Sequence, residues 1–189
     1  MYLQLTATQI DMGIAKILGN TVPTAKCHAY TQVGRCGIID WPVVLDPPSE
    51  RTFIIIPSCV MVGSPKFQDR YLLHWAKEEM KKPVHVIIPM HEKNHWTLLV
   101  RTADRFWVHI DSIPNTIDAY SNDIIQALDP GTQRLFHTQF WEQSSTWDCG
   151  HCVLAAIDWA LATDDIATDR PPSLTQQNIE TIIESVKFK

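Results

Sequence analysis

Residues 84–111 read VHVIIPMHEKNHWTLLVRTADRFWVHID, and this stretch decides the fold. Apolar and β-branched residues dominate 84–89, 95–101 and 106–111, which is typical of buried β-strands. The short polar stretch 102–105 joins the last two as a hairpin. The sequence therefore predicts a run of strands in the middle of the chain.

Helices are expected on both sides of these strands. Apolar residues recur at helical spacing in residues 5–18, and residues 67–82 form an amphipathic pattern. A buried helix is predicted from Cys149 to Leu161, with Asp148 as its N-cap. Further expected elements are a strand within 53–62 broken at Pro57, a helix at 122–129, a strand at 134–140, a helix near 175–186, and loops over 19–50. We therefore predict one α+β domain over residues 1–189.

The composition is that of a globular protein. Of 189 residues, 45% are hydrophobic and 20% charged, which is enough to build a core. Sixteen Lys and Arg stand against 21 Asp and Glu, so the formal charge is -5. A mildly acidic chain lacks the basic face that general nucleic-acid binding needs. No apolar run approaches the ~20 residues of a membrane-spanning helix. We expect no nucleic-acid partner, no membrane insertion and a monomer.

The cysteines point to a reducing compartment. The chain has five of them, an odd number, and its start lacks the basic and long apolar regions of a signal peptide. Reduced thiols in the cytoplasm or nucleus are therefore expected. The remaining question is whether one of these thiols is reactive.

Cys149 is the strongest candidate for a reactive thiol. At a helix N-terminus, the dipole and the free N–H groups lower a thiol pKa, and the same N–H groups can hold an oxyanion. Gly150 follows, and its missing side chain is expected to leave space beside the sulfur for a substrate backbone. An inert buried cysteine is the competing interpretation.

His95 and Asp111 are the candidate partners of Cys149. His95 begins one predicted strand and Asp111 ends the next, so the hairpin places them opposite or diagonal, with Cβ atoms ~5–8 Å apart. At that distance an aspartate can fix the imidazole tautomer and stabilise the imidazolium. Taken singly, each residue is equally compatible with a structural role.

The residues around these three carry a family resemblance. His95-Trp96, Asp111-Ser112 and the stretch QSSTWDCG from Gln143 to Gly150 resemble the Ulp1-like cysteine proteases, which cleave SUMO, NEDD8 or ubiquitin from conjugates. That family has the same order of His, Asp, Gln and Cys, with the Gln six residues before the Cys. The resemblance implies an α+β papain-like architecture with a central mixed sheet.

The resemblance also implies residue roles. Cys149 is the nucleophile, His95 the general base and Asp111 its orienting partner. Gln143 donates to the oxyanion, and Trp96 covers the channel that admits the Gly-Gly tail of the modifier. The implied partner is a ubiquitin-like modifier with its conjugates, and neither a metal nor another cofactor is implied.

One departure concerns the start of the chain. The family usually has a Trp-Leu pair there, forming the opposite wall of the channel. In this sequence Gln4-Leu5 occupies the corresponding place.

Alternatives use the same cysteines and histidines. CGHC at 149–152 matches the dithiol string of disulfide isomerases, although Asp148 replaces the expected Trp and few residues follow. Zinc could bind both cysteines and two histidines, but no second CxxC or HxxxH is present. His91 is an alternative base, placed in a loop; His109 could be a core residue, and His151 is expected to be partly exposed.

Two further alternatives concern the function as a whole. A relative of this protease fold transfers acetyl groups with the same kind of Cys-His-acid site. A modifier-binding module without catalysis would tolerate loss of Cys149, so an intact set of three residues favours an enzyme.

Overall fold

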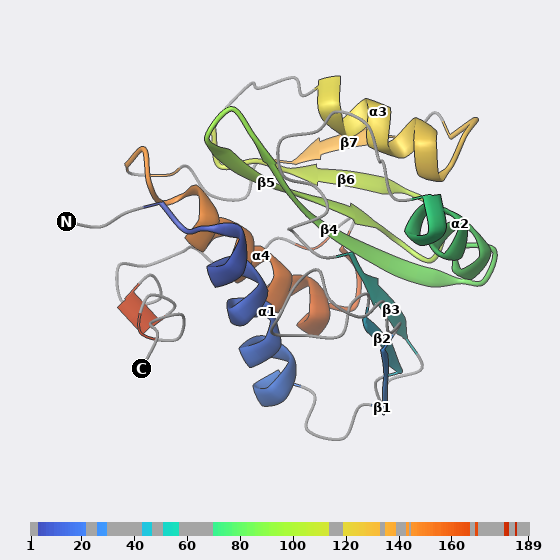
Figure 1. The fold of residues 1–189 in the computed structure, drawn as a ribbon, viewed down its shortest axis with the longest axis horizontal. Coiled ribbons are helices and arrows are strands. Elements are labelled where there is room, and N and C mark those ends of the chain that lie inside the picture. Colours follow the sequence, from blue (N-terminus) through green and yellow to red (C-terminus); the bar gives the residue numbers. More distant parts are fainter. Residues whose placement is uncertain are drawn as a thin grey trace.

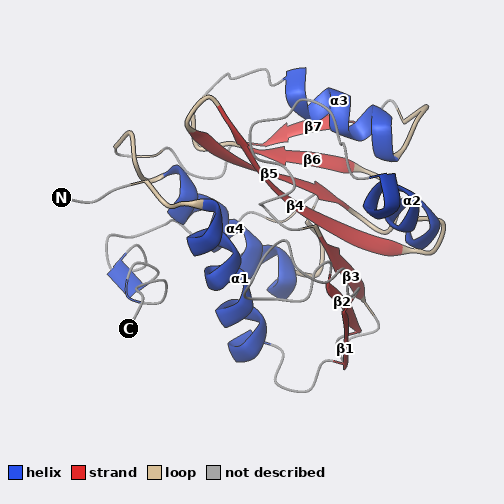
Figure 2. Ribbon diagram, in the orientation of Figure 1, coloured by secondary structure: helices blue, strands red, loops and turns tan. Residues whose placement is uncertain are grey.

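A seven-stranded sheet forms the centre of the protein (Figures 1 and 2). The computed structural model describes residues 4–21, 26–29, 43–46, 51–56, 70–113, 119–132, 135–138, 143, 145–166, 169, 180–181 and 184. The strands are β1 (Lys26–Ala29), β2 (Val43–Asp46), β3 (Thr52–Ile55), β4 (Val84–Glu92), β5 (His95–Arg101), β6 (Trp107–Ile110) and β7 (Leu135–Thr138). The helices are α1 (Ala7–Thr21), α2 (Arg70–Glu79), α3 (Ala119–Leu128) and α4 (Cys149–Ala162).

The strands lie in the sheet in chain order, from β1 to β7. Neighbours are antiparallel except β3 with β4 and β6 with β7, which are parallel. A parallel pair needs a crossover connection, and α2 and α3 lie in these two connections. The sheet is therefore mixed, and the α+β class predicted from the sequence is confirmed.

The two faces of the sheet carry separate cores because side chains alternate along each strand. In β5, Trp96 and Leu98 pack with α1 and α4, whereas Leu99 packs on the other face with α3. Figure 1 shows α1 beside α4 on one side of the sheet, and α2 and α3 on the other. Within the described residues, no helix is long and apolar enough to cross a membrane.

The β4–β5 hairpin is the tightest turn near the candidate site. Glu92 pairs with His95, and the two residues between them, Lys93 and Asn94, have φ angles of 49° and 62°. Positive φ at both central positions is the signature of a type I′ turn, whose twist matches that of the flanking strands. The turn therefore fixes where β5 begins, and His95 is the first residue of that strand.

Most predicted elements are confirmed, but two were missed. Strands β1 and β2 lie in the stretch 19–50 that was expected to be loops, because its Gly, Pro and polar residues hid two short strands. β4 continues to Glu92, so His91 lies in a strand and not in a loop. The predicted helix near 175–186 lies for the most part outside the described residues.

Candidate active site

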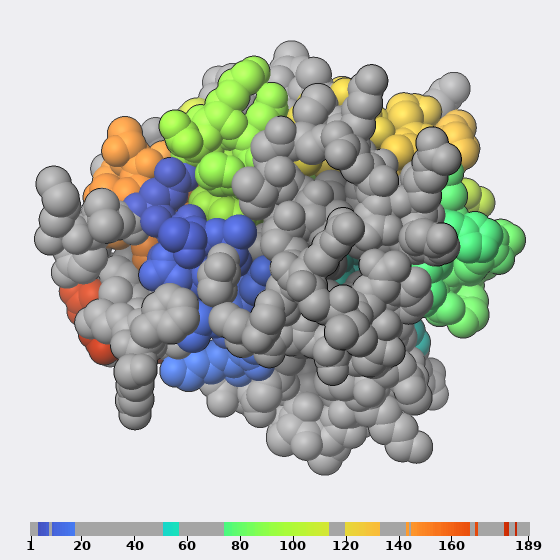
Figure 3. All heavy atoms as spheres, in the orientation of Figure 1, coloured from blue at the N-terminus to red at the C-terminus, as the bar shows by residue number. Residues whose placement is uncertain are grey.

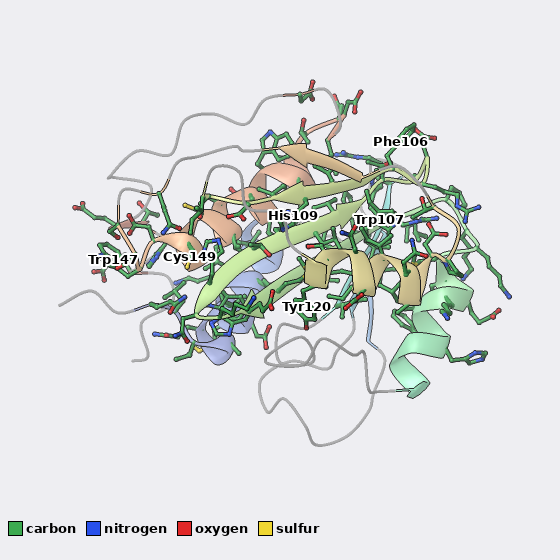
Figure 4. The ribbon with its side chains drawn as sticks, turned by 90° about the horizontal axis from the view of Figure 1, so that it is seen from above. Phe106, Trp107, His109, Tyr120, Trp147 and Cys149 are labelled. Atoms are coloured by element: carbon green, nitrogen blue, oxygen red, sulfur yellow. The ribbon has the colours of Figure 1, made fainter. Side chains whose placement is uncertain are left out.

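Cys149 is the first residue of α4, as predicted, and its side chain is fully buried. Asp148 occupies the N-cap position, as predicted, although its carboxylate makes no capping hydrogen bond. Figure 4 shows Cys149 at one end of the molecule, near Trp147, with Phe106 and Trp107 toward the opposite end. The N-terminal end of the helix dipole thus points at the sulfur.

His95 and Asp111 form a direct ion pair at the same end of the sheet. The His95 Nε2 lies 2.7 Å from Asp111 Oδ1. Leu98 pairs with Ile110, so Asp111 lies opposite Thr97 and diagonal to His95, which is one of the two arrangements predicted from the hairpin. The same carboxylate oxygen accepts a hydrogen bond from the Ile113 backbone N–H at 2.9 Å, which fixes its orientation.

The other ring nitrogen of His95 faces the Cys149 side chain, with which His95 forms a hydrogen bond. Because Nε2 is paired with Asp111, Nδ1 is the nitrogen left for the hydrogen bond that His95 makes with the Cys149 side chain. Burial lowers the pKa of His95, but the bonds to Asp111 and Cys149 outweigh it and raise this pKa to about 9. The imidazole is therefore held in its protonated form at neutral pH.

The Cys149 pKa moves in the complementary direction. Burial raises it, but hydrogen bonds from His95, from the Trp96 backbone N–H and from the Gln4 side chain together bring it below the usual value for a thiol. A lowered thiol pKa next to a raised imidazole pKa favours a thiolate–imidazolium pair. That pair combines a nucleophile with a proton donor, as acyl transfer requires.

Gln143 is anchored to the residue after Asp111. Its backbone N–H donates to the Ser112 carbonyl at 3.0 Å, and its side-chain Oε1 accepts from the Ser112 hydroxyl at 2.7 Å. Ser112 therefore holds the oxygen end of the amide and leaves the Nε2 end as the donor. This orientation suits the predicted oxyanion role, which remains a prediction.

Trp96 and Gly150 are less accessible than the sequence predicted. The Trp96 side chain is only 1% exposed, and its Nε1–H donates to the Leu5 carbonyl at 2.7 Å. A Cβ added at Gly150 would lie 3.0 Å from the Leu5 side chain, so Leu5 fills the space that was expected to be open. The N-terminal segment therefore occupies the space that was predicted to be open beside Gly150, whereas the channel role of Trp96 stays a prediction.

The other histidines take no part in the pair. His91 packs its ring against Trp96, with centroids 4.5 Å apart, and burial lowers its pKa. His109 is buried in β6, as a core residue would be. The expected partial exposure of His151 is wrong, since this residue is 1% exposed and packs edge-on to Trp147.

Cys152 lies one turn further along α4 and differs sharply from Cys149. Burial raises the pKa of Cys152 to about 12, and neither cysteine is in a disulfide.

Among the described residues no three His, Cys, Asp or Glu side chains gather as a metal site would require. A cavity of about 10 Å³, roughly the space of one water, lies between Trp96, Asp111, Ser112 and the two cysteines.

Two residues of this site have no role in the sequence-based predictions. Ser112 was noted only as part of the Asp-Ser pair, and Gln4 only as a substitute for the family tryptophan. Gln4 Nε2 lies 3.3 Å from the Cys149 sulfur, although 145 positions separate the two residues. No local pattern could reveal such a contact, because it depends on how the N-terminal segment packs.

Comparisons with solved structures bear on the fold of the chain. No protein-family model matches the sequence, and no curated protein does. The Xanthomonas campestris effector XopD bound to ubiquitin has a similar structure, with a TM-score of 0.66 and 17% identity over 98% of this chain and 91% of that one. The SUMO protease Ulp1, with its catalytic cysteine oxidised, gives a TM-score of 0.60 at 14% identity over 97% and 75% of the two chains.

The chain has the fold of the Ulp1-type proteases. The C-terminal Ulp1 protease domain in complex with Smt3, the yeast ortholog of SUMO, also matches, with a TM-score of 0.55 at 11% identity over 98% and 95% of the chains. The predicted resemblance to Ulp1-like proteases is thus confirmed at the level of the fold. At these identities the chemistry has to be argued from the residues of this chain.

Proposed function

We propose that this protein is a cysteine protease or isopeptidase that cleaves after the Gly-Gly tail of a ubiquitin-like modifier. The observation that carries the proposal is His95, which hydrogen-bonds Asp111 through Nε2 and also bonds the Cys149 side chain. The Ulp1-type fold supports it, since XopD is bound to ubiquitin and Ulp1 is a SUMO protease.

The arrangement accounts for both halves of the reaction. The Cys149 thiolate attacks the carbonyl carbon of the terminal glycine, and the imidazolium of His95 gives its Nδ1 proton to the leaving amine as the C–N bond breaks. Water then attacks the thioester while His95 takes a proton from it, which releases the carboxylate and regenerates Cys149. Asp111 keeps the ring aligned throughout.

The developing oxyanion needs donors near Cys149. The backbone N–H of Cys149 at the start of α4 is one, and the Nε2 of Gln143 is proposed as the other. Ser112 contributes indirectly, since its hydroxyl holds Oε1 and so determines which end of the Gln143 amide faces the reaction.

A panel of activity-based probes tests the proposal. Ubiquitin, SUMO and NEDD8, each with a C-terminal electrophile, are incubated with the full chain and with Cys149→Ala. We expect at least one probe to label the parent at Cys149 and none to label the variant. Absence of labelling by all three, together with acetylation of Cys149 by acetyl-CoA, would show an acetyltransferase instead.

A further inference from the structure

The N-terminal segment contributes a side chain to the reactive sulfur. Gln4 Nε2 donates to Cys149 Sγ at 3.3 Å, and the same nitrogen donates to the Asn94 backbone carbonyl. An amide nitrogen carries two hydrogens, so the two bonds use both of them. The Asn94 contact thus directs the second N–H toward the sulfur.

Both anchors of Gln4 are themselves fixed. Asn94 lies in the type I′ turn between β4 and β5, which sets the direction of its carbonyl. On the other side, the Leu5 carbonyl accepts from Trp96 Nε1 at 2.7 Å, and the Leu5 side chain packs over Gly150. Figure 3 shows the N-terminal residues, the β4–β5 region and the residues before α4 meeting at one surface.

The helix that follows keeps this segment in place. Thr6 and Gln9 form a reciprocal capping box at the start of α1: the Thr6 N–H donates to Gln9 Oε1 at 2.9 Å, and the Gln9 N–H donates to Thr6 Oγ1 at 3.3 Å. The capping box therefore fixes the direction in which the chain enters α1, and the residues just before the helix, including Gln4, take a defined course.

We propose that Gln4 is a catalytic residue that stabilises the Cys149 thiolate through its side-chain N–H. This inference rests on the proposed function for the role of Cys149 as nucleophile. A neutral donor favours the anionic sulfur without repelling the imidazolium of His95 on its other side. Where the Ulp1-like family usually has an aromatic channel wall, this chain thus has a hydrogen-bond donor.

Several charged or titratable groups lie near this sulfur and must be held constant. His95 bonds Cys149 directly, and Cys152 interacts with it from one turn further along α4. Asp111 bonds His95, His91 interacts with His95, and Asp148 interacts with Cys152. Substitutions at Gln4 leave all of them in place. A change in the Cys149 titration can therefore be assigned to the Gln4 amide.

The test measures the Cys149 pKa directly by thiolate absorbance near 240 nm. Each variant is titrated against its counterpart carrying Cys149→Ala, so the difference reports this one sulfur. We expect Gln4→Ala to raise the pKa by about one pH unit, the effect of losing one hydrogen bond to a charged group. Gln4→Glu should raise it further, because a carboxylate would face the thiolate.

Gln9→Ala is the matched control, since it removes a glutamine from the same segment without touching Cys149. We expect a lower Tm for this variant and a Cys149 pKa close to that of the parent, because Gln4 keeps its own bond to the Asn94 carbonyl when the capping box is lost. If Gln4→Ala leaves the pKa unchanged, or Gln9→Ala shifts it equally, the inference is wrong and Gln4 serves only to hold the segment.

Turnover gives a second, separable readout. On a modifier substrate, Gln4→Ala should lower kcat/KM about tenfold at pH values below the Cys149 pKa and approach the parent as the pH rises, because the thiolate then forms without help. A loss independent of pH would contradict thiolate stabilisation. If the parent cleaves no modifier, the proposed function fails, while the absorbance titration still decides the role of Gln4.

Discussion

Strand β5 carries an ion pair at each of its ends, and only one of them includes a group that can gain or lose a proton near neutral pH. At the start of the strand, His95 Nε2 lies 2.7 Å from Asp111 Oδ1. At its end, Arg101 Nε lies 3.1 Å from Asp129 Oδ2, with the Arg101 side chain 1% exposed. Charge pairing is therefore common to both ends, although the His95 side chain is 20% exposed and the Arg101 side chain is almost fully buried.

Arg101 and His95 differ in their remaining hydrogen-bond partners and in whether they can change charge. Arg101 also donates to the backbone carbonyls of Val84 at 3.2 Å and Met80 at 3.5 Å, and its guanidinium stays charged at any accessible pH. His95 keeps one ring nitrogen for a thiol and can gain or lose a proton. A buried ion pair thus becomes reactive only where a titratable group faces a nucleophile.

The larger of two cavities lies at the Arg101 end of β5, away from Cys149. A cavity of about 460 Å³ opens beside Arg101, lined by Lys77, Lys81, Arg105 and Asp129 among others. The space beside Cys149 measures about 10 Å³. The sulfur is enclosed because the Leu5 side chain packs against Gly150 and the Leu5 carbonyl accepts a hydrogen bond from Trp96. Under the proposed function, a Gly-Gly tail would have to displace or pass this segment.

Removal of the nucleophile gives the largest expected effect on the comparison. Cys149→Ala should abolish turnover, because no other group at this end of β5 can form the thioester. Binding of the modifier should hardly change, since only one buried sulfur is lost. Turnover of a modifier–fluorophore conjugate and titration of modifier binding measure the two quantities. Residual turnover in the folded variant would mean that another residue is the nucleophile.

Substitution of the two carboxylates separates the two ends. Asp111→Asn should lower kcat/KM by about 10²–10⁴-fold with a small loss of stability, because asparagine still offers an oxygen to His95 and Ile113. Asp129→Asn should cost about 3–5 kcal/mol of unfolding free energy, because the Arg101 charge remains buried without its partner.

Denaturant unfolding measures the stability of both variants, and turnover per folded molecule measures their activity. Together they test whether Asp111→Asn mainly lowers activity and Asp129→Asn mainly lowers stability. The Asp129→Asn protein that remains folded should turn over substrate at the parent rate. Equal losses of activity at both positions would mean that the Arg101 end is also part of the active site, and the comparison would fail.

Gln143→Ala should have the next largest effect, again at the His95 end alone. Loss of one oxyanion donor lowers kcat by about 10²–10³-fold with little change in modifier binding. Ser112→Ala is the informative companion, because it removes the bond that holds Oε1 and keeps the amide itself. A smaller loss for Ser112→Ala is expected from steady-state kinetics, and no loss in either variant would remove Gln143 from the reaction.

The sequence predicted the parts of this comparison that depend on local pattern. β5 runs from His95 to Arg101, as the apolar run indicated, and α4 begins at Cys149. The hairpin register then placed Asp111 near His95. Contacts across the chain were beyond such patterns: Gln4 reaches Cys149 over 145 positions, and Leu5 buries Trp96. Trp96→Ala therefore removes a core side chain and should destabilise the fold.

Cys152→Ala should have the smallest effect on activity of the substitutions near Cys149. The Cys152 thiol is buried, its pKa is raised to about 12, and it hydrogen-bonds Ser112. Its loss removes one sulfur from the core, at a cost of about 1 kcal/mol, and leaves the bond from Ser112 to Gln143 in place. Activity should therefore stay close to that of the parent in the modifier assay. A dithiol oxidoreductase needs its second cysteine to resolve a mixed disulfide, whereas a cysteine protease needs only the first. Loss of activity in a folded Cys152→Ala protein, with disulfide exchange by the parent, would overturn the protease assignment in favour of the CGHC alternative.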